Sequence, residues 1–268
     1  MFNVKYTPTG LVDRFKARLV AQGFSQVPGD DFLETFSPTI RAESLRLLLA
    51  IGAYEDLEIR QVDVVSAYPR SDLHVEVYMR PLEGLDCPKG SALRIQKSLY
   101  GLKQSGREWY IEACKGLKGL GLEPLFADPS VFTTTDRKLL VSLYVNDMLI
   151  LAKDPAVVDQ AVAFIQGRWQ IKDLGDVGQI LRIRVTRDRK RRLLFLDQGP
   201  YIDQLVKRFG LEKAKPFPTP AADRTALLRS DGTEQQADQH LYQQGVGSLA
   251  WLAVCTRPDV AYVWGQLS

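Results

Sequence analysis

The sequence predicts an α+β fold with a mixed or antiparallel sheet. Segments of strand character are separated in some places by helical segments and in others only by tight turns, an alternation typical of α+β proteins. The chain has 268 residues, 45% hydrophobic and 25% charged, which is enough apolar material for a sizeable core. A doubly wound fold fits less well, because helices separate consecutive strands throughout such folds.

The first third of the chain predicts a hairpin, a helix and a strand. Residues 2–24 alternate on each side of a Pro/Gly turn at Pro8 to Gly10. Leucines recur at helical spacing from Arg41 to Tyr54. LEIRQVDVVSAY, residues 57–68, is rich in β-branched residues and is bounded by Pro69. Because the first strand starts almost at Met1, its partner elements are expected to be missing, as in a fragment.

The rest of the chain predicts five more helices and two hairpins. Glycines end the first of these helices, and Pro155 begins the second. In order we expect a helix over 105–122, a hairpin over 139–152, a helix over 155–169, strands over 179–186 and 192–198 around a charged turn, a helix over 200–211, a proline-bearing linker over 215–239, and helices before Thr256 and after Pro258.

Composition excludes several classes of protein. A net charge of +3 gives no whole-chain argument for a polyanionic partner. Three distant cysteines and two histidines form neither a disulfide framework nor a zinc site, which suits a reducing compartment. No segment has the pattern of a signal peptide, and no apolar run approaches the roughly 18 residues of a membrane helix. We therefore expect a protein of the cytosol or nucleus with no membrane partner.

Two aspartates interrupt apolar strands. In LYVNDMLILA, residues 143–152, Asn146 and Asp147 break two apolar runs, either because both residues tolerate the positive φ of a two-residue turn or because Asp147 binds a metal. Asp63 lies within RQVDVVSAY, where it is either an exposed carboxylate on a wet face or a metal ligand. Two carboxylates on neighbouring strands could hold two magnesium ions about 4 Å apart, as in phosphoryl transfer.

Between the aspartates lies SLYGLKQSGREWY, residues 98–110. A glycine turn with Lys103, Gln104 and Arg107 leads into a helix, and it could press against a nucleotide. The signal is weak alone, since Gly101 lacks the glycine spacing of a P-loop or a dinucleotide fingerprint.

The chain resembles the copia-type retrotransposon reverse transcriptase. The shared motifs occur in the family's order and spacing: FKARLVAQGFSQ, ETFSPTIRAESLRLLLAI, QVDVVSAY, VEVYMRP, SLYGLKQSGREWY, LYVNDMLI, KDLGD, YIDQLVKRFGL and GSLAWLAVCTRPDVAY. The resemblance implies a right-hand polymerase architecture with fingers and palm, the palm sheet packed on helices. It also implies nucleotidyl transfer with two Mg²⁺ ions, Mn²⁺ being an alternative, from a dNTP to a primer on an RNA or DNA template.

The resemblance also implies roles for individual residues. Asp63 and Asp147 would be catalytic metal ligands, with Asn146 beside them and Val64 contributing its carbonyl. Ala67 would offer a backbone N–H to the triphosphate, and Tyr68 would be a steric gate against the ribose 2′-hydroxyl. The other nucleotide-binding residues would be Tyr100, Gly101, Lys103, Lys16 and Arg18, the last two being otherwise an ordinary solvated strand face; Tyr144 would contact nucleic acid.

The sequence departs from the family at its hairpin tip. The family reads Tyr-x-Asp-Asp where this chain has Tyr144, Val145, Asn146 and Asp147. An amide keeps one oxygen but lacks the negative charge that two close cations require, so we expect activity reduced by orders of magnitude. Pro69, Arg70 and Ser71 replace an apolar residue and Asn-Gly after Tyr68, and Arg182 stands where the family favours glycine.

Residues 182–192, RIRVTRDRKRR, carry seven basic residues against one acid. Arg189 and Lys190 are the residues we expect to contact a phosphate backbone. The same stretch is equally interpreted as a solvated hairpin turn or as a fortuitous nuclear-localisation-like patch.

The resemblance divides the chain into fingers (1–40 and 82–105), palm (41–81 and 106–185), a thumb-like start (186–215) and a truncated linker and connection-like segment (216–268). The function expected is RNA-directed DNA polymerisation, impaired by Asn146. The alternatives are a catalytically inactive nucleic-acid-binding remnant and a product too unstable to fold. Expression, template preference and oligomeric state leave no trace in the sequence.

Overall fold

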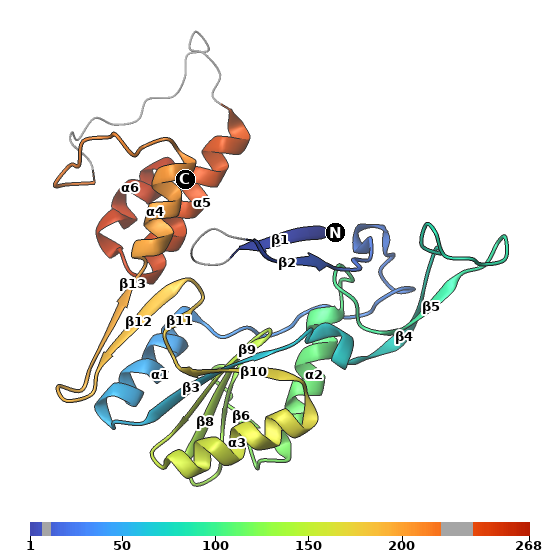
Figure 1. Cartoon of the computed structure of the whole chain (residues 1–268), viewed down its shortest axis with the longest axis horizontal. Coiled ribbons are helices and arrows are strands. Elements are labelled where there is room, and N and C mark those ends of the chain that lie inside the picture. The colour runs from blue at the N-terminus through green and yellow to red at the C-terminus, as the bar shows by residue number, and fades with distance from the viewer. Residues whose placement is uncertain (7–11, 221–237) are drawn as a thin grey trace. The chain divides into compact units, whose positions relative to one another are not determined.

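The computed structural model describes residues 1–6, 12–220 and 238–268 and has an α+β fold (Figure 1). The described chain forms two compact units, Met1–Leu48 with Glu55–Asp176 and Leu49–Tyr54 with Val177–Ser268. The turn expected at Pro8 to Gly10 and most of the linker expected over 215–239 lie outside the described residues.

The first unit is built on a six-stranded antiparallel sheet in the order β10-β3-β9-β8-β7-β6. Its strands are β3 (Glu58–Val64), β6 (Glu123–Pro124), β7 (Val131–Thr133), β8 (Leu139–Tyr144), β9 (Asp147–Ala152) and β10 (Ile171–Asp176). Two smaller pairs accompany it: β1 (Phe2–Tyr6) with β2 (Val12–Ala17), and β4 (Asp72–Met79) with β5 (Leu93–Lys97).

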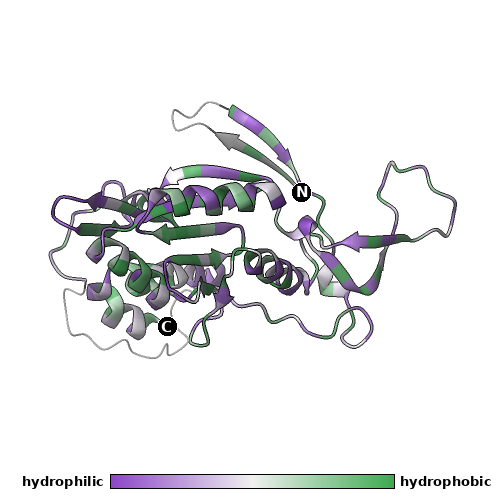
Figure 2. Ribbon diagram, turned by 90° about the horizontal axis from the view of Figure 1, so that it is seen from below, coloured by the Kyte–Doolittle hydropathy of each residue, from purple (hydrophilic) through white to green (hydrophobic). Residues whose placement is uncertain are grey.

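Helices α2 (Ser105–Lys118) and α3 (Pro155–Arg168) cover one face of this sheet. Trp109, Ala113 and Leu117 of α2 pack with Val62, Met148 and Ile150 of the strands in one buried cluster. Several strands in Figure 2 have the hydrophobic colour along much of their length, in keeping with the apolar sequences of β7, β8 and β9. Side chains alternate along a strand, so the residues between these apolar positions, Asp63 and Asp147 included, belong to the opposite face.

The helices expected in the first unit are confirmed. Helix α1 (Ala42–Tyr54) starts where Asp128 accepts the N–H of Arg41. Helix α3 starts at Pro155, and its N-cap Asp154 accepts the N–H of Ala156. Helix α2 ends at Lys118 with Gly119 as its C-cap, so a glycine lies at its end as expected, although the helix is shorter than the expected 105–122. Two 3₁₀ turns complete the unit: η1 (Gly23–Ser25) and η2 (Tyr68–Arg70).

The strand expected over 57–68 is shorter than predicted. It ends at Val64, because Ser66 has a φ of +55° and the chain then enters η2. Strand β10 was not expected from the sequence, since IKDLGD lacks the alternation of a half-buried strand.

The second unit joins a three-stranded antiparallel sheet to helices. Strands β11 (Gln179–Ile180), β12 (Ile183–Asp188) and β13 (Leu193–Asp197) are consecutive. Helices α4 (Gly199–Arg208), α5 (Gln239–Cys255) and α6 (Ala261–Leu267) confirm the expected helices, with η3 (Pro258–Val260) between the last two. Arg182 has a φ of +62°, a conformation that suits glycine better, and its guanidinium lies 5.6 Å from the ring centroid of Tyr201.

Candidate active site

The two aspartates singled out from the sequence meet across adjacent strands. In the antiparallel pairing of β3 with β9, Asp63 lies directly opposite Asp147. Residues in this relation share one face of a sheet, with Cβ atoms about 5 Å apart. Both side chains are half-buried. The fold therefore turns two carboxylates distant in the sequence into one pair.

The pair is the centre of a row of four residues across the sheet. Tyr144 lies opposite Asp147 on β8, and Lys172 lies opposite Asp63 on β10. We call Tyr144, Asp147, Asp63 and Lys172 the carboxylate row. Lys172 was not singled out from the sequence, because only the pairing of β10 with β3 brings it beside Asp63.

The carboxylate of Asp147 is destabilised where it lies. Burial, and then the charge of Asp63, raise the pKa of Asp147 above its usual value. The Gln61 amide, 3.5 Å from Oδ1 of Asp147, acts in the opposite direction. Gln61 precedes Asp63 by two residues on the same face of β3 and was likewise not singled out from the sequence. A bound cation would offset the repulsion between the two carboxylates, so the pair fits a divalent metal.

The tip of the hairpin supplies an amide rather than a third carboxylate. The backbone oxygen of Asn146 accepts the N–H of Val64 at 2.8 Å, which fixes the tip beside the end of β3. Among the residues that the structure describes, no three His, Cys, Asp or Glu side chains form a group that could hold a metal ion. The fixed donors here are thus two carboxylates, with the Asn146 amide and the Val64 carbonyl nearby in sequence.

The turn at the tip differs from the one expected. Neither Asn146 nor Asp147 has a positive φ; the residue that does is Val145, at +53°. The interpretation that Asn and Asp were placed there to adopt this conformation is therefore wrong. A β-branched residue in this region is an outlier, and it stores strain next to the aspartate pair.

Tyr68 and Tyr100 lie together near Tyr144, a member of the carboxylate row. The ring centroids of Tyr68 and Tyr100 are 4.9 Å apart. Burial first, then Tyr100 and Tyr144, raise the pKa of Tyr68, so Tyr144 belongs to the same group. Ala67 is fully buried directly before Tyr68. The residues expected to contact a nucleotide sugar and the carboxylate row are thus neighbours.

The glycine turn after Tyr100 is packed against Val20 and Ala21, which follow β2 in the chain. Ala21 donates its N–H to the oxygen of Tyr100 at 2.7 Å, and the guanidinium of Arg18 lies 5.3 Å from the Tyr100 ring centroid. Gly101 has a φ of +91°, and a Cβ there would lie 2.1 Å from the oxygen of Ala21. Arg18, Tyr100 and Gly101, three of the residues expected to bind the nucleotide, are therefore brought together.

Two other predicted nucleotide contacts have different surroundings. The ammonium of Lys103 lies 5.4 Å from the ring centroid of Phe32, and the Lys103 N–H donates to Oε1 of Gln26. Lys16 lies in β2 opposite Asn3. The contacts of Lys103 are thus with the 26–32 segment.

The basic stretch over 182–192 is partly structural. Arg187 donates to the oxygen of Gly52 at 3.0 Å and Arg192 to that of Tyr54 at 3.1 Å, both in the last turn of α1. Arg189 and Lys190 lie in the turn between β12 and β13. The stretch thus forms the hairpin expected there, and Arg187 and Arg192 bind carbonyls that a helix C-terminus leaves without an intrahelical partner.

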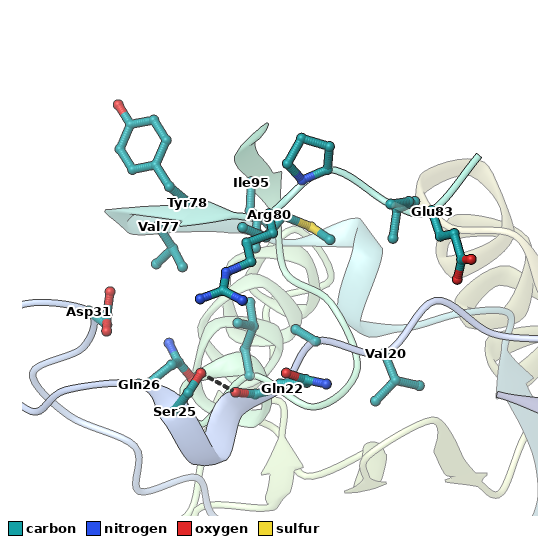
Figure 3. A pocket seen from close by; sticks show the side chains of 15 residues that line it. Val20, Gln22, Ser25, Gln26, Asp31, Val77, Tyr78, Arg80, Glu83 and Ile95 are labelled. Atoms are coloured by element: carbon teal, nitrogen blue, oxygen red, sulfur yellow. Dashed lines mark hydrogen bonds between the residues drawn. The ribbon is translucent and has the colours of Figure 1, made fainter. Parts of the chain in front are cut away.

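A cavity of about 640 Å³ lies elsewhere in the first unit (Figure 3). It is bounded by the 20–31 segment, by residues 77–83, and by Ile95 and Leu102. No member of the carboxylate row lines it. Within the described residues, no helix is both long and apolar enough to cross a membrane.

Comparison with known proteins gives consistent matches. The profile of the family described as reverse transcriptase (RNA-dependent DNA polymerase) matches residues 2–223. The retrovirus-related Pol polyprotein from transposon TNT 1-94 of Nicotiana tabacum is 37% identical over 95% of this chain. That from transposon RE1 of Arabidopsis thaliana is 37% identical over 100% of it. The truncated transposon Ty1-A Gag-Pol polyprotein of Saccharomyces cerevisiae is 36% identical over 59% of it.

These relatives are much longer than the chain. The matched region spans 20% of the Nicotiana polyprotein, 18% of the Arabidopsis one and 13% of the truncated yeast one. The chain therefore corresponds to one segment of such polyproteins.

Proposed function

This chain belongs to the reverse transcriptase (RNA-dependent DNA polymerase) family and corresponds to that segment of copia-type Pol polyproteins, and from this premise we propose that the carboxylate row is its nucleotidyl-transfer site. The observation that carries the proposal is the register that places Asp63 opposite Asp147. The substrates would be a dNTP and a primer annealed to an RNA or DNA template.

The chemistry is a displacement at phosphorus. The primer 3′-hydroxyl oxygen forms a bond to the α-phosphorus, the bond from that phosphorus to the β-phosphate oxygen breaks, diphosphate leaves, and the hydroxyl proton passes to solvent. Bound Mg²⁺, or Mn²⁺ in its place, would favour the ionised hydroxyl and offset charge on the phosphates. Asp63 and Asp147 would hold the metal, with the Val64 carbonyl as a further ligand.

The residues around the row would position the nucleotide. Tyr68, packed on Tyr100, would lie against the sugar as a steric gate. Ala67 would present its backbone N–H to the triphosphate. Arg18, held over the Tyr100 ring, would face the negative charge of the triphosphate, together with Lys16, Lys103 and the backbone of Gly101. Tyr144, at the end of the row, would contact the nucleic acid. In this proposal residues 1–40 and 82–105 are fingers, 41–81 and 106–185 are palm, and 186–215 start a thumb.

Asn146 weakens this site in the proposal. Two cations held close together repel each other, and each missing carboxylate leaves more of that repulsion uncompensated. Every 1.36 kcal/mol of lost transition-state stabilisation costs about tenfold in rate. We therefore expect the native chain to be slower than Asn146→Asp by orders of magnitude.

A catalytically inactive nucleic-acid-binding remnant is the second candidate, and Asn146 is the observation that favours it. Primer extension on poly(rA) with oligo(dT), dTTP and Mg²⁺ separates the two when the native chain, Asn146→Asp and Asp63→Ala are compared. Extension by Asn146→Asp but not by Asp63→Ala supports the proposed site. Binding of primer-template by all three with extension by none supports the remnant.

A further inference from the structure

The strained turn at the hairpin tip is held from outside the hairpin. Val145 is β-branched and has a φ of +53°, a conformation that is costly for such a residue and persists only where surrounding structure imposes it. The two residues of the turn, Val145 and Asn146, each offer a backbone oxygen. Both oxygens are bound by other elements, so the surrounding structure that imposes the turn can be identified.

One of the two contacts comes from a buried indole. Trp109 of α2 donates its Nε1–H to the oxygen of Val145 at 2.6 Å. Its side chain is 1% exposed and meets Trp169 edge-on, with ring centroids 5.3 Å apart. The other contact is the N–H of Val64, which donates to the oxygen of Asn146. The turn is thus fixed between helix α2 and the strand that carries Asp63.

A buried indole needs a partner for its N–H, so the bond has a purely structural interpretation. The location of the hydrogen bond indicates a role in the candidate site as well. The bonded carbonyl belongs to the strained residue, two positions before Asp147, and rotation of this peptide would change the direction in which the following residues leave the turn. A neighbouring group that orients a metal ligand commonly changes metal affinity by 10–100-fold when it is lost.

We infer that Trp109 is a positioning residue, which holds the 145–146 turn in the conformation that sets Asp147 opposite Asp63 and thereby determines the divalent-cation affinity of the pair. The part that concerns the cation rests on the proposed function; the part that concerns the turn does not. Trp109 itself touches neither substrate nor metal in this inference.

The first experiment measures the turn without any metal. Trp109→Phe keeps an aromatic ring in the core but has no N–H to donate. We expect amide hydrogen exchange in residues 145–148 to accelerate about tenfold or more relative to the native chain. Trp169→Phe is the matched control, because Trp169 belongs to the same buried cluster but its ring meets Trp109 rather than the turn. Equal exchange in the two variants would show that the hydrogen bond from Trp109 does not hold the turn.

The second experiment measures Mn²⁺ binding by electron paramagnetic resonance in the Asn146→Asp background. Trp109→Phe should weaken binding about 10-fold and Trp169→Phe should leave it unchanged. Adding Val145→Gly to Trp109→Phe should restore Mn²⁺ binding, because glycine adopts the positive φ without a hydrogen bond to hold it there. Loss of core packing alone would not be rescued by removing another side chain.

The outcomes distinguish this inference from the proposed function. If Asn146→Asp binds Mn²⁺ no better than Asp63→Ala does, the proposed function fails. The exchange experiment alone then decides whether Trp109 holds the turn. If Mn²⁺ binds and Trp109→Phe does not weaken it, Trp109 is a core residue and the inference is wrong while the proposed function stands.

Discussion

At the scale of single residues, the half-buried carboxylate of Asp147 lies opposite that of Asp63, so two like charges share one face of the sheet. This arrangement leads to a prediction about the stability of the metal-free protein.

Asp147→Asn is expected to stabilise the metal-free protein at neutral pH by roughly 1 kcal/mol. Burial and Asp63 raise the pKa of Asp147, so the native state binds this proton more readily than the unfolded state does. Ionising the group above its unfolded pKa therefore costs native stability, and the amide removes that cost. Below the unfolded pKa the carboxyl is protonated in both states, so the gain should vanish. Urea unfolding of the native chain and the variant, in neutral and in acidic buffer, measures the gain in stability and its loss at low pH.

Asp173→Asn is the contrasting variant. Arg60 donates to both oxygens of Asp173, at 2.8 and 2.7 Å, and this lowers the pKa of Asp173. The stabilisation is present above the unfolded pKa and is lost as pH falls through the lower folded pKa, so the substitution should cost up to about 1 kcal/mol at neutral pH. If both variants shift stability in the same direction, the electrostatic explanation for Asp147 is wrong.

Asp63 and Asp147 could be singled out from the sequence, but the residues beside them could not. Each aspartate interrupts an apolar run, and burying a carboxylate there is costly enough to single it out. Lys172 and Gln61 carry no such signal, since their closeness to the pair depends on strand register, which a local pattern does not specify. The positive φ at Val145 could not be predicted either, because residue preference assigns that conformation to Asn146.

At the scale of elements, substitutions at Gly101 and Gly121 distinguish the cost of a steric clash from the cost of backbone strain. Both have a positive φ, +91° and +70°, but only Gly101 has neighbours within 4 Å of an added Cβ. We expect Gly121→Ala to cost about 1 kcal/mol and Gly101→Ala at least about 2 kcal/mol more, because the backbone of Ala21 must move. Urea midpoints at constant m-value test this. Equal losses would mean that Ala21 and the glycine turn are not held together here.

Arg192→Ala should destabilise the chain by about 1 kcal/mol, because the side chain donates to the last carbonyl of α1. Lys190→Ala, in the same basic turn, should leave stability within experimental error. Thermal unfolding of the two variants measures the difference. Similar losses from both would indicate a general charge effect instead of a helix contact.

The same turn tests the expectation of phosphate contacts at Arg189 and Lys190. If Lys190 neutralises one phosphate, Lys190→Ala should lower the slope of log affinity against log salt by about 1, with little change in sequence preference. Fluorescence anisotropy of labelled primer-template over a salt series gives the slope. An unchanged slope would leave the basic stretch with its structural role at α1 alone.

Helices were predictable from the sequence to within a few residues, whereas strand ends were not. Helices α1, α3 and α4 have local signals, namely periodic leucines, Pro155 after an N-cap Asp154, and Pro200 in the first turn. The end of β3 depends on Ser66 and on the hydrogen bond from Val65 to the oxygen of Gln170, a contact between residues far apart in sequence. The two-residue strands β6 and β11 are too short for any periodic pattern.

At the scale of the whole molecule, the two units differ in the size of their cores. The first unit has a buried cluster drawn entirely from residues 62–169, spanning its sheet and two helices. Among the described residues of the second unit, one smaller cluster consists of Tyr201, Leu205 and Leu252 with three partly buried neighbours, and further buried apolar residues, Ile180, Ile183 and Val185, lie in its sheet. Since stability depends on the apolar surface removed from water, the first unit should supply most of the stability of the chain.

We therefore expect residues 1–176 to unfold cooperatively on their own, and residues 177–268 not to fold alone. Helix α1 crosses from one unit to the other, so the first fragment keeps its last turn but loses Arg187 and Arg192, and it should melt at a lower temperature than the full chain. Circular dichroism melts of both fragments and the full chain test this. Ile150→Ala, at a fully buried position, should lower the free energy of unfolding of fragment 1–176 by about 2–5 kcal/mol if the packing is specific. A broad melt insensitive to that substitution would instead indicate a collapsed chain without a native core, which is what the unstable-product alternative requires.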